Sequence, residues 1–248
     1  MDLQDRVAIV TGGSGGLGQR ICRALASNSV HVVVNYAESE AKALGVAREL
    51  TALGPRAIAL QADVTDPAQV ARMVWQANKE FGRIDILVND AAFNAYVPFK
   101  ELDNLTLDLW HKILETNLTG PFVCTKAVAP LMKAHGQGRI VNISSGAGFR
   151  PRGSSIAYAV SKAGINHLTM CMAVALAPEV LVNCVAPGFM EGTRMTENLA
   201  SAPSTWSGAS TNSLKRAVDK DDVARQVVEL CRTDSTTGHT VLIDCGRF

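Results

Sequence analysis

Residues 6–18 read RVAIVTGGSGGLG, a short run of mostly apolar residues that stops at a cluster of glycines. A helical pattern of apolar residues follows directly, through Ile21, Leu25 and Ala26. Glycines between a first strand and a first helix allow a tight turn, and they let backbone N–H groups approach a pyrophosphate at the positive end of the helix. A glycine cluster alone is equally consistent with a flexible turn, so the surrounding sheet decides between the two interpretations.

The rest of the chain alternates short apolar runs with amphipathic stretches. The apolar runs predict strands at 6–11, 30–34, 56–61, 84–89, 138–144, 180–185 and 240–243. Amphipathic stretches predict helices after residue 18, at 39–53, from 66 onward, at 105–134 with an interruption near 117–120, at 155–177 and at 221–231. Continuous apolar strands that alternate with helices are typical of a parallel sheet covered on both faces. We therefore expect an α/β fold, a Rossmann-type doubly wound parallel sheet of about seven strands.

Composition narrows the class of protein further. The chain has 248 residues, a net charge of +1 and 47% hydrophobic residues, and its Lys and Arg are scattered. This pattern excludes the basic footprint of a nucleic-acid-binding protein, and no apolar run is long enough to span a bilayer. Asp2 and Asp5 before the first apolar run argue against a signal peptide. No linker or repeat divides the sequence, so residues 1–248 are expected to form one domain.

The six cysteines are far apart and include no C-x-x-C pair. This spacing predicts free thiols in a reducing cytoplasm, with neither a disulfide framework nor a metal site.

Tyr158 and Lys162 are four residues apart in a segment predicted to be helical from about Ser155, so both side chains share one helix face. A tyrosine titrates near ~10 in water and exchanges protons poorly at neutral pH unless its phenolate is stabilised. A lysine cation one turn away can supply that stabilisation, since moving a pKa by ~3 units requires only about 4 kcal/mol. Taken alone, the pair is better explained as a half-buried tyrosine and a solvated lysine.

Several further motifs occur in a fixed order along the chain. Together they resemble the short-chain dehydrogenases/reductases, in particular 3-oxoacyl-acyl-carrier-protein reductases and related carbonyl reductases, over essentially the whole chain. The residues that carry the resemblance are Thr11-Gly12-x-x-x-Gly16-x-Gly18, Asn89-Asp90-Ala91-Ala92, Asn117, Ser145, Tyr158-x-x-x-Lys162 and Asn183-x-x-x-Pro187-Gly188.

The resemblance implies an NAD(P)(H)-dependent oxidoreductase that interconverts a ketone and a secondary alcohol by hydride transfer. It implies that Tyr158 is the general acid/base, and that Lys162 binds the nicotinamide ribose and lowers the pKa of the tyrosine. It implies that Ser145, thirteen residues before Tyr158, hydrogen-bonds the substrate oxygen, and leaves Ser144 as a strand-end residue. Asn117 would hold a water molecule in a proton relay, or cap a kinked helix. The alternative function is a catalytically idle nucleotide-binding regulator of the same fold.

The resemblance also implies a set of cofactor contacts. Asp63 would accept a hydrogen bond from the adenine amino group, or serve only as a turn residue. The full expected set is Gly12, Ser14, Gly16, Leu17, Gly18, Asn35, Tyr36, Asp63, Val64, Asn89, Ala91, Tyr158, Lys162, Pro187, Gly188 and Thr193.

The sequence departs from the family pattern at four places. Asp90 and Ala92 replace the Asn and Gly of N-N-A-G. The Asp90 carboxylate is either a solvated surface charge, which we favour, or a charge that alters the site. Ala92 implies either no need for positive φ or a slightly different loop. Gly192 looks like a one-residue insertion before Thr193, and Cys245 occupies a position that is usually glycine.

The end of the second strand bears on the choice of cofactor. An acidic residue there would accept hydrogen bonds from the ribose of NAD, but Asn35, Tyr36 and Ala37 are neutral. The basic residues common in NADP enzymes are also missing at Gly15 and Ala37, and Glu38 is the nearest acid. NADP(H) is favoured, and NAD(H) is not excluded.

Substrate choice in this family lies in loops after strands four, five and six, here 93–99, 147–156 and 189–213, of which the last is expected to act as a substrate lid. Their apolar side chains would line a pocket for a small-molecule ketone or alcohol, or pack on one another. The resemblance also implies a homotetramer, or a dimer, that packs through the helices at 117–134 and 158–177. The apolar set is Phe93, Tyr96, Phe149, Phe189, Met190, Met195 and Trp206.

Overall fold

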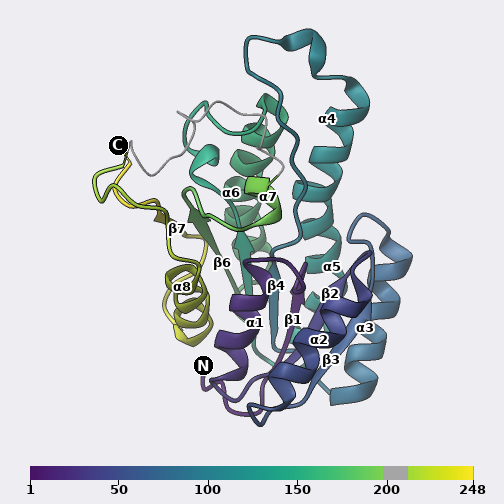
Figure 1. Cartoon of the computed structure of the whole chain (residues 1–248). Coiled ribbons are helices and arrows are strands. Elements are labelled where there is room, and N and C mark those ends of the chain that lie inside the picture. Colours follow the sequence, from purple (N-terminus) through teal and green to yellow (C-terminus); the bar gives the residue numbers. More distant parts are fainter. Residues whose placement is uncertain (198–211, 248) are drawn as a thin grey trace.

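The computed structural model describes residues 1–197 and 212–247. All seven strands in these residues belong to one parallel sheet, in the order β3-β2-β1-β4-β5-β6-β7 (Figure 1). The predicted doubly wound parallel sheet is therefore confirmed. The strands are β1 (Val7–Thr11), β2 (His31–Tyr36), β3 (Ala57–Gln61), β4 (Ile86–Asn89), β5 (Gly138–Ile143), β6 (Val180–Pro187) and β7 (Thr240–Ile243).

Helices connect the strands close to the predicted positions. Three short helical turns interrupt the connections: η1 (Leu102–Asn104), the π-helical η2 (Glu115–Thr119) and the 3₁₀ turn η3 (Gly146–Gly148). The α-helices are α1 (Gly18–Ala26), α2 (Glu40–Thr51), α3 (Pro67–Phe81), α4 (Leu107–Leu114), α5 (Gly120–Ala134), α6 (Ile156–Leu176), α7 (Arg194–Glu197) and α8 (Lys220–Arg232).

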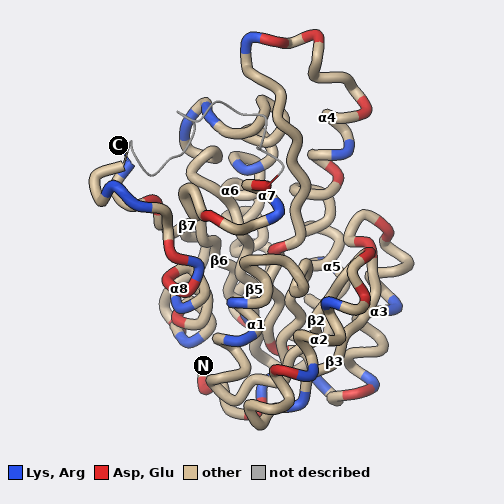
Figure 2. The backbone as a smooth tube through the Cα atoms, in the orientation of Figure 1, with Lys and Arg blue, Asp and Glu red and all other residues tan. Residues whose placement is uncertain are grey.

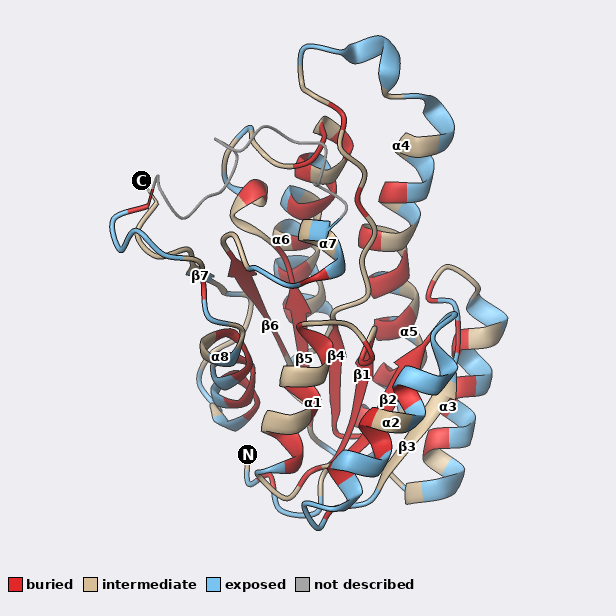
Figure 3. Ribbon diagram, in the orientation of Figure 1, coloured by how far each residue is buried: buried red, intermediate tan, exposed pale blue. Residues whose placement is uncertain are grey.

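The core has two halves, one on each face of the sheet. Helices α1, α2 and α8 cover one face, and α3, α5 and α6 cover the other (Figure 1). Side chains of a strand alternate between the halves: Ala8 and Val10 belong to the first, and Ile9 to the second. The strands β1, β2, β4, β5 and β6 are therefore buried on both faces, as Figure 3 shows in red, and this explains their continuous apolar sequences. β3 and β7, at the two edges of the sheet, are only partly buried.

The order of the strands creates a crevice. The chain moves outward from β1 to β2 and β3, then returns and places β4 on the other side of β1. The connections after β1 and β4 consequently leave the sheet in opposite directions. In open parallel sheets, ligands bind at this switch point, beyond the carboxyl ends of the strands. The glycine cluster after β1 lies at this point.

A buried ion pair holds the opposite end of the sheet together. The Asp85 carboxylate, just before β4, is fully buried and accepts hydrogen bonds from Arg83 Nε (2.8 Å) and from the backbone N–H of Val7 (3.0 Å). Arg6 Nη1 lies 3.3 Å from the same carboxylate. These contacts fix the start of β1 against the start of β4, at the end of the sheet opposite the crevice.

Charged residues are scattered over the molecule, and Figure 2 shows both signs interspersed along the chain. Across residues 1–197 and 212–247, none of the helices combines the length and apolar character that crossing a bilayer requires.

Candidate active site

A cavity of about 810 Å³ opens at the carboxyl end of the sheet. Its walls come from the loops that follow β1, β2, β3, β4, β5, β6 and β7, as expected for a site at the switch point. Three of the predicted site residues, Gly18, Asn89 and Asn117, do not line it. The predicted residues that do are Gly12, Ser14, Gly16, Leu17, Asn35, Tyr36, Asp63, Val64, Ala91, Ser145, Tyr158, Lys162, Pro187, Gly188 and Thr193.

The glycine loop after β1 is a tight turn whose glycines are required by close contacts. Gly12 has a φ of +64°, and the N–H of Gly15 donates to its carbonyl oxygen (2.8 Å). A side chain at Gly16 would place its Cβ 2.8 Å from the carbonyl oxygen of Gly192. At Gly18, a Cβ would collide with the carbonyl oxygen of Gly12. Gly18 therefore serves the packing of the turn, although the sequence grouped it with the cofactor contacts.

Helix α6 positions the proposed proton-transfer pair. Ser155 caps the helix by accepting a hydrogen bond from the N–H of Tyr158 (3.2 Å), so the helix begins where the sequence predicted. One turn later, Lys162 is only 4% exposed, and its Nζ donates to the carbonyl oxygen of Ile143 at the end of β5 (2.9 Å). The same Nζ lies 5.7 Å from the centre of the Tyr158 ring. The phenol and the ammonium thus face the cavity together.

Burial determines how this pair titrates. Burial raises the pKa of the Tyr158 phenol, a hydrogen bond with the Ser145 hydroxyl lowers it, and the charge of Asp90 raises it. Burial and the charge of Asp90 together outweigh the effect of Ser145, so the pKa of the phenol lies above its ordinary value. That Lys162 lowers the pKa of the tyrosine stays a prediction. Burial also lowers the pKa of Lys162 to about 8, against the attraction of Asp90 and Cys184.

The two adjacent serines have different surroundings. Ser144 is buried, and its Oγ donates to the carbonyl oxygen of Lys162 (2.9 Å), which ties the end of β5 to α6. Ser145 lines the cavity and accepts from the N–H of Ala147 (3.2 Å), and its hydroxyl lowers the pKa of the Tyr158 phenol. This geometry agrees with the sequence-based choice of Ser145 over Ser144.

Asn117 lies in the π-helical turn between α4 and α5 and is 1% exposed. Its Oδ1 accepts from the N–H of Phe93 (2.7 Å), and its Nδ2 donates to the carbonyl oxygen of Phe93 (2.9 Å) and to Ser161 Oγ (3.1 Å). The amide does not cap its own helix. Instead it binds the loop after β4 to α6 and so positions the wall that carries Tyr158.

Asn89, the last residue of β4, points into the interior. Its Nδ2 donates to Asn142 Oδ1 (2.8 Å), and Asn142 Nδ2 in turn donates to Thr169 Oγ1 (3.0 Å) on α6. This buried chain of hydrogen bonds joins β4, β5 and α6. Asn89 therefore joins elements inside the protein and does not line the cavity, although the sequence grouped it with the cofactor contacts.

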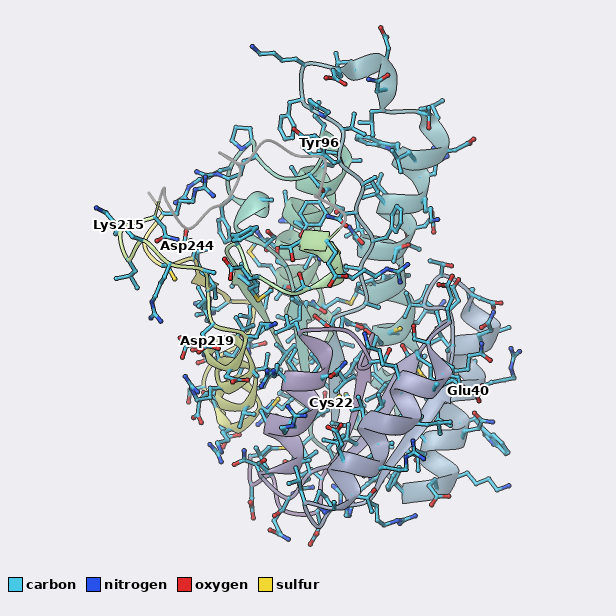
Figure 4. The ribbon with its side chains drawn as sticks, viewed as in Figure 1. Cys22, Glu40, Tyr96, Lys215, Asp219 and Asp244 are labelled. Carbon is cyan, nitrogen blue, oxygen red and sulfur yellow. The ribbon has the colours of Figure 1, made fainter. Side chains whose placement is uncertain are left out.

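Asp90 corrects an expectation from the sequence. It was predicted to be a solvated surface charge, but it lines the cavity beside Lys162, and burial raises its pKa to about 7. The reason is its place at the switch point, where helix α1 covers the end of β4: the Asp90 carboxylate lies against Gly18 and interacts electrostatically with Cys22. Cys22 is labelled in Figure 4, between α1 and the sheet.

Thr11 was quoted as part of the glycine motif but was not predicted as a site residue. Its Oγ1 accepts from the N–H groups of Asp90 (3.0 Å) and Ala91 (3.1 Å), and it holds the two sides of the crevice at a fixed separation. Its position at the end of β1, opposite the motif after β4, was the available signal.

Ala92 does not have positive φ, so no glycine is needed there.

At the end of the cavity formed by the loops after β2 and β3, the side chains supplied by β2 itself are uncharged. Asn35 Nδ2 donates to the carbonyl oxygen of Ala62 (3.0 Å), and Asn35 Oδ1 accepts from the N–H of Gly12 (3.2 Å). Burial raises the pKa of the Tyr36 phenol, and so does Glu40 at the start of α2. Lys42 also lines this end, together with Glu38 and Ser39.

Asp63 closes a turn, as one of its two predicted roles requires, and its contact with adenine stays a prediction. It lines the cavity, while its Oδ1 closes a turn by accepting from the N–H (2.9 Å) and the Oγ1 (2.8 Å) of Thr65. Its second carboxylate oxygen has no hydrogen bond within the described residues.

The segment after β6 lies against the glycine loop. Gly192 has a φ of +62°, and the buried Thr193 shares hydrogen bonds with Thr196 and faces Gly16. Cys245 has a φ of +59°, which explains why a glycine would also suit that position.

Among the apolar residues expected in a substrate pocket, Phe93, Phe189, Met190 and Met195 line the cavity. Phe149 and Tyr96 do not, and Tyr96 lies in the loop between β4 and α4 (Figure 4). Trp206 lies outside the described residues.

Fold and site together define a dinucleotide-binding α/β protein with a tyrosine–lysine–serine centre at the switch point. Residues 6–204 match the family model of the short chain dehydrogenases. The chain belongs to this family of oxidoreductases. It is 40% identical to the granaticin polyketide synthase putative ketoacyl reductase 2 of Streptomyces violaceoruber, over 97% of this chain and 95% of the relative.

Two further comparisons agree. The chain is 42% identical to a 3-oxoacyl-[acyl-carrier-protein] reductase of Synechocystis, over 81% of this chain and 80% of the relative. Among solved structures it is similar to a short chain dehydrogenase from Burkholderia cenocepacia in complex with NADP, with a TM-score of 0.90 and 34% identity over 100% of this chain and 99% of the other.

Proposed function

We propose that this protein is an NADP(H)-dependent reductase that interconverts a ketone and a secondary alcohol, with Tyr158 as the proton donor and acceptor. The observation that carries the proposal is the grouping at the cavity wall: Ser145, Tyr158 and Lys162 line it together, and the Lys162 ammonium lies 5.7 Å from the centre of the phenol ring. The nicotinamide cofactor supplies the hydride when bound. The chain supplies the proton and the groups that hold the carbonyl.

Each residue has a distinct task. Tyr158 has a raised pKa, so it remains protonated at neutral pH and can donate its proton to the carbonyl oxygen during reduction. Ser145 donates a hydrogen bond where negative charge develops on that oxygen. Lys162 places a buried positive charge beneath both groups and is available to the ribose hydroxyls of the cofactor.

The alternative of an idle nucleotide-binding regulator is disfavoured because Ser145, Tyr158 and Lys162 are all present and face one cavity. A protein that only binds a nucleotide requires the glycine loop but not a buried lysine next to a phenol.

NADP(H) is favoured by the walls at the β2 end of the cavity. Asn35 and Tyr36 offer no carboxylate to the ribose, and Lys42 offers a cation within reach of the same wall. The similar proteins agree, since one was solved with NADP. Initial rates with NADPH and NADH at equal concentration test this assignment, and a large preference for NADH would contradict it.

Turnover tests the reaction. A panel of ketones is offered with NADPH, and consumption is followed at the nicotinamide absorbance band. We expect Tyr158→Phe to bind NADPH normally and to lose about 10²–10⁴-fold in kcat on any substrate found. Turnover that survives in the variant would contradict the mechanism.

The adjacent serines provide a matched comparison. Ser145→Ala should reduce kcat, since the hydroxyl faces the carbonyl. Ser144→Ala removes only a structural hydrogen bond, so it should lower the free energy of unfolding by about 1 kcal/mol. Its loss of kcat should be much smaller than that of Ser145→Ala. Equal losses of kcat in the two variants would contradict the role of Ser145.

The protein is further proposed to be a cytoplasmic homotetramer whose 189–213 segment acts as a substrate lid. A shallow apolar hollow on the outer faces of α5 and α6 supports the assembly; it includes Phe122, Leu168 and Cys171, and Phe122 is 41% exposed. Light scattering on a Phe122→Asp variant tests the interface, and an unchanged assembly would contradict it.

All six cysteines are free, which suits the proposed cytoplasmic location, a reducing compartment. Cell fractionation tests the location.

A further inference from the structure

Three arginines gather on the wall of the cavity at its β5–β7 side. Arg150 and Arg152 belong to the loop between η3 and α6, and Arg247 belongs to the segment after β7. All three side chains are partly buried and line the cavity. Neither the hydride nor the proton step of the proposed reaction requires them.

A small network of contacts holds the arginines together. The N–H of Arg152 donates to the carbonyl oxygen of Arg150 (2.7 Å), so the loop turns sharply between them. Arg150 Nη1 lies 3.3 Å from Asp244 Oδ2. The other oxygen of Asp244 accepts from the N–H groups of Gly246 (3.0 Å) and Arg247 (3.2 Å), which fixes the segment that carries the third guanidinium. Asp244 is labelled in Figure 4, on the β7 side of the molecule.

This arrangement concentrates positive charge. Arg150 forms an ion pair with Asp244, and within the described residues no ion pair joins Arg152 or Arg247 to an acid. Burial lowers the pKa of Arg152, and so do the charges of Arg247 and Arg150. Like charges held together in a recess repel one another, and a bound anion relieves that repulsion. Guanidinium groups also match the geometry of carboxylate and phosphate oxygens.

The position of the cluster argues against a role in cofactor binding. The glycine loop that suits a diphosphate follows β1. Asn35, at the end of β2, and Asp63, just after β3, line the cavity where the proposed function places the adenosine. Arg150 and Arg247 follow β5 and β7, at the other side of the sheet. Between the two ends lie Tyr158 and Ser145. The arginines therefore face the part of the cavity that remains for the substrate.

We propose that Arg150, Arg152 and Arg247 bind an anionic group of the substrate, a carboxylate or a phosphoryl group, at a distance from the reacting carbonyl. The inference rests on the proposed function, because it assigns the substrate class of the same site. Asp244 is the positioning residue that sets Arg150 and Arg247 in place.

Paired substrates test the proposal. Methyl ketones with a terminal carboxylate, in a series of chain lengths, are compared with their methyl esters. A 3-oxoacyl thioester of phosphopantetheine, which carries a phosphate, is compared with the thioester of N-acetylcysteamine, which does not. The two arms distinguish a carboxylate from a phosphoryl group. We expect one anionic member to exceed its neutral partner at least tenfold in kcat/KM.

Variants connect the preference to the residues. Arg152→Gln and Arg247→Gln should each lower the anionic-to-neutral ratio of kcat/KM at least tenfold, mainly through KM, while Arg152→Lys should retain part of it. Arg72→Gln, at an exposed position on α3, is the control and should leave the ratio unchanged. Thermal unfolding and NADPH titration establish that each variant is folded.

Two results would overturn the proposal: neutral and anionic partners turned over equally well, or an anionic preference that survives in both glutamine variants. Either result leaves the reductase intact. Failure to reduce any ketone in the panel would instead contradict the proposed function itself.

Discussion

The Nζ of Lys162 donates a 2.9 Å hydrogen bond to the carbonyl oxygen of Ile143, the last residue of β5. This contact holds a positive charge inside the protein, beside the phenol of Tyr158, and burial lowers the pKa of the ammonium to about 8. The end of β5 therefore fixes the cation that the proposed reaction uses, at a cost in folding free energy.

Replacing this lysine should separate activity from stability. Methionine is similar in length and carries no charge, so Lys162→Met removes the cost of burying an ammonium, and the free energy of unfolding at pH 7 should be unchanged or higher. We expect kcat to fall about 10²-fold or more and NADPH to bind more weakly. Urea unfolding and single-turnover assays measure the two effects. A variant that is both active and unstable would refute this account.

Asp90 should make stability depend on pH. Burial raises its pKa to about 7, whereas an unfolded aspartate titrates near ~3.9. Between these values the folded protein keeps a proton that the unfolded chain has lost, so the free energy of unfolding falls as pH rises. Asp90→Asn removes this loss. Its free energy of unfolding should exceed that of the parent protein by at least about 1 kcal/mol at pH 8, and the difference should be much smaller at pH 5.

Urea unfolding of both proteins at pH 5 and pH 8 measures the difference. Asp103→Asn, at an exposed position in η1, is the control. A stability gain that does not grow with pH would show that the Asp90 carboxylate is not held in a desolvated site.

The same variant should change the pH dependence of catalysis. The Asp90 carboxylate raises the pKa of Lys162 against the effect of burial. Without it, Lys162 should lose its proton at a lower pH, and the alkaline limb of the kcat profile should move to lower pH. A profile that stays in place would mean that Lys162 ionisation does not limit turnover in that range.

The buried carboxylate at the other end of the sheet should carry much of the stability of the fold. Asp85→Ala leaves Arg83 and the N–H of Val7 without their acceptor, and we expect a loss of about 3 kcal/mol in the free energy of unfolding. Asp222→Ala breaks the exposed ion pair with Arg225 and should cost less than about 1 kcal/mol. Denaturant midpoints compare the two. Equal losses would contradict the importance of the buried contact.

Two glycines provide a test of the phosphate loop. Gly16→Ala places a Cβ 2.8 Å from the carbonyl oxygen of Gly192, so the loop must shift, and displacements near 1 Å can reduce rates about 10²-fold. Gly45→Ala, within α2, has no atom within 4 Å of the new Cβ and should stabilise the protein by about 0.5–1 kcal/mol. NADPH titration and thermal unfolding distinguish them. Normal NADPH affinity in Gly16→Ala would exclude a close approach of this loop to the cofactor.

The local sequence pattern was sufficient to predict the strands and the helices, including the helix that carries Tyr158 and Lys162. β7 was predicted at its observed bounds, and Ser155 was predicted as the start of α6, because apolar periodicity and capping residues act over a few neighbouring positions. The interruption near Asn117 was also visible, as a break in the helical pattern, and corresponds to η2.

The surroundings of individual side chains were decided only by the tertiary structure. The sequence suggested a solvated Asp90, yet its carboxylate lies against Gly18 at the start of α1 and lines the cavity. The contacts of the Asn117 amide with the backbone of Phe93 were not visible in the sequence. Arg150 and Asp244 are 94 positions apart and meet because β5, β6 and β7 are neighbours in the sheet. Burial and charge pairing depend on residues brought together by the whole fold, and these set pKa values and substrate contacts. The sequence by itself determined the elements and the reacting groups; the packing of the sheet against its helices decided what surrounds them.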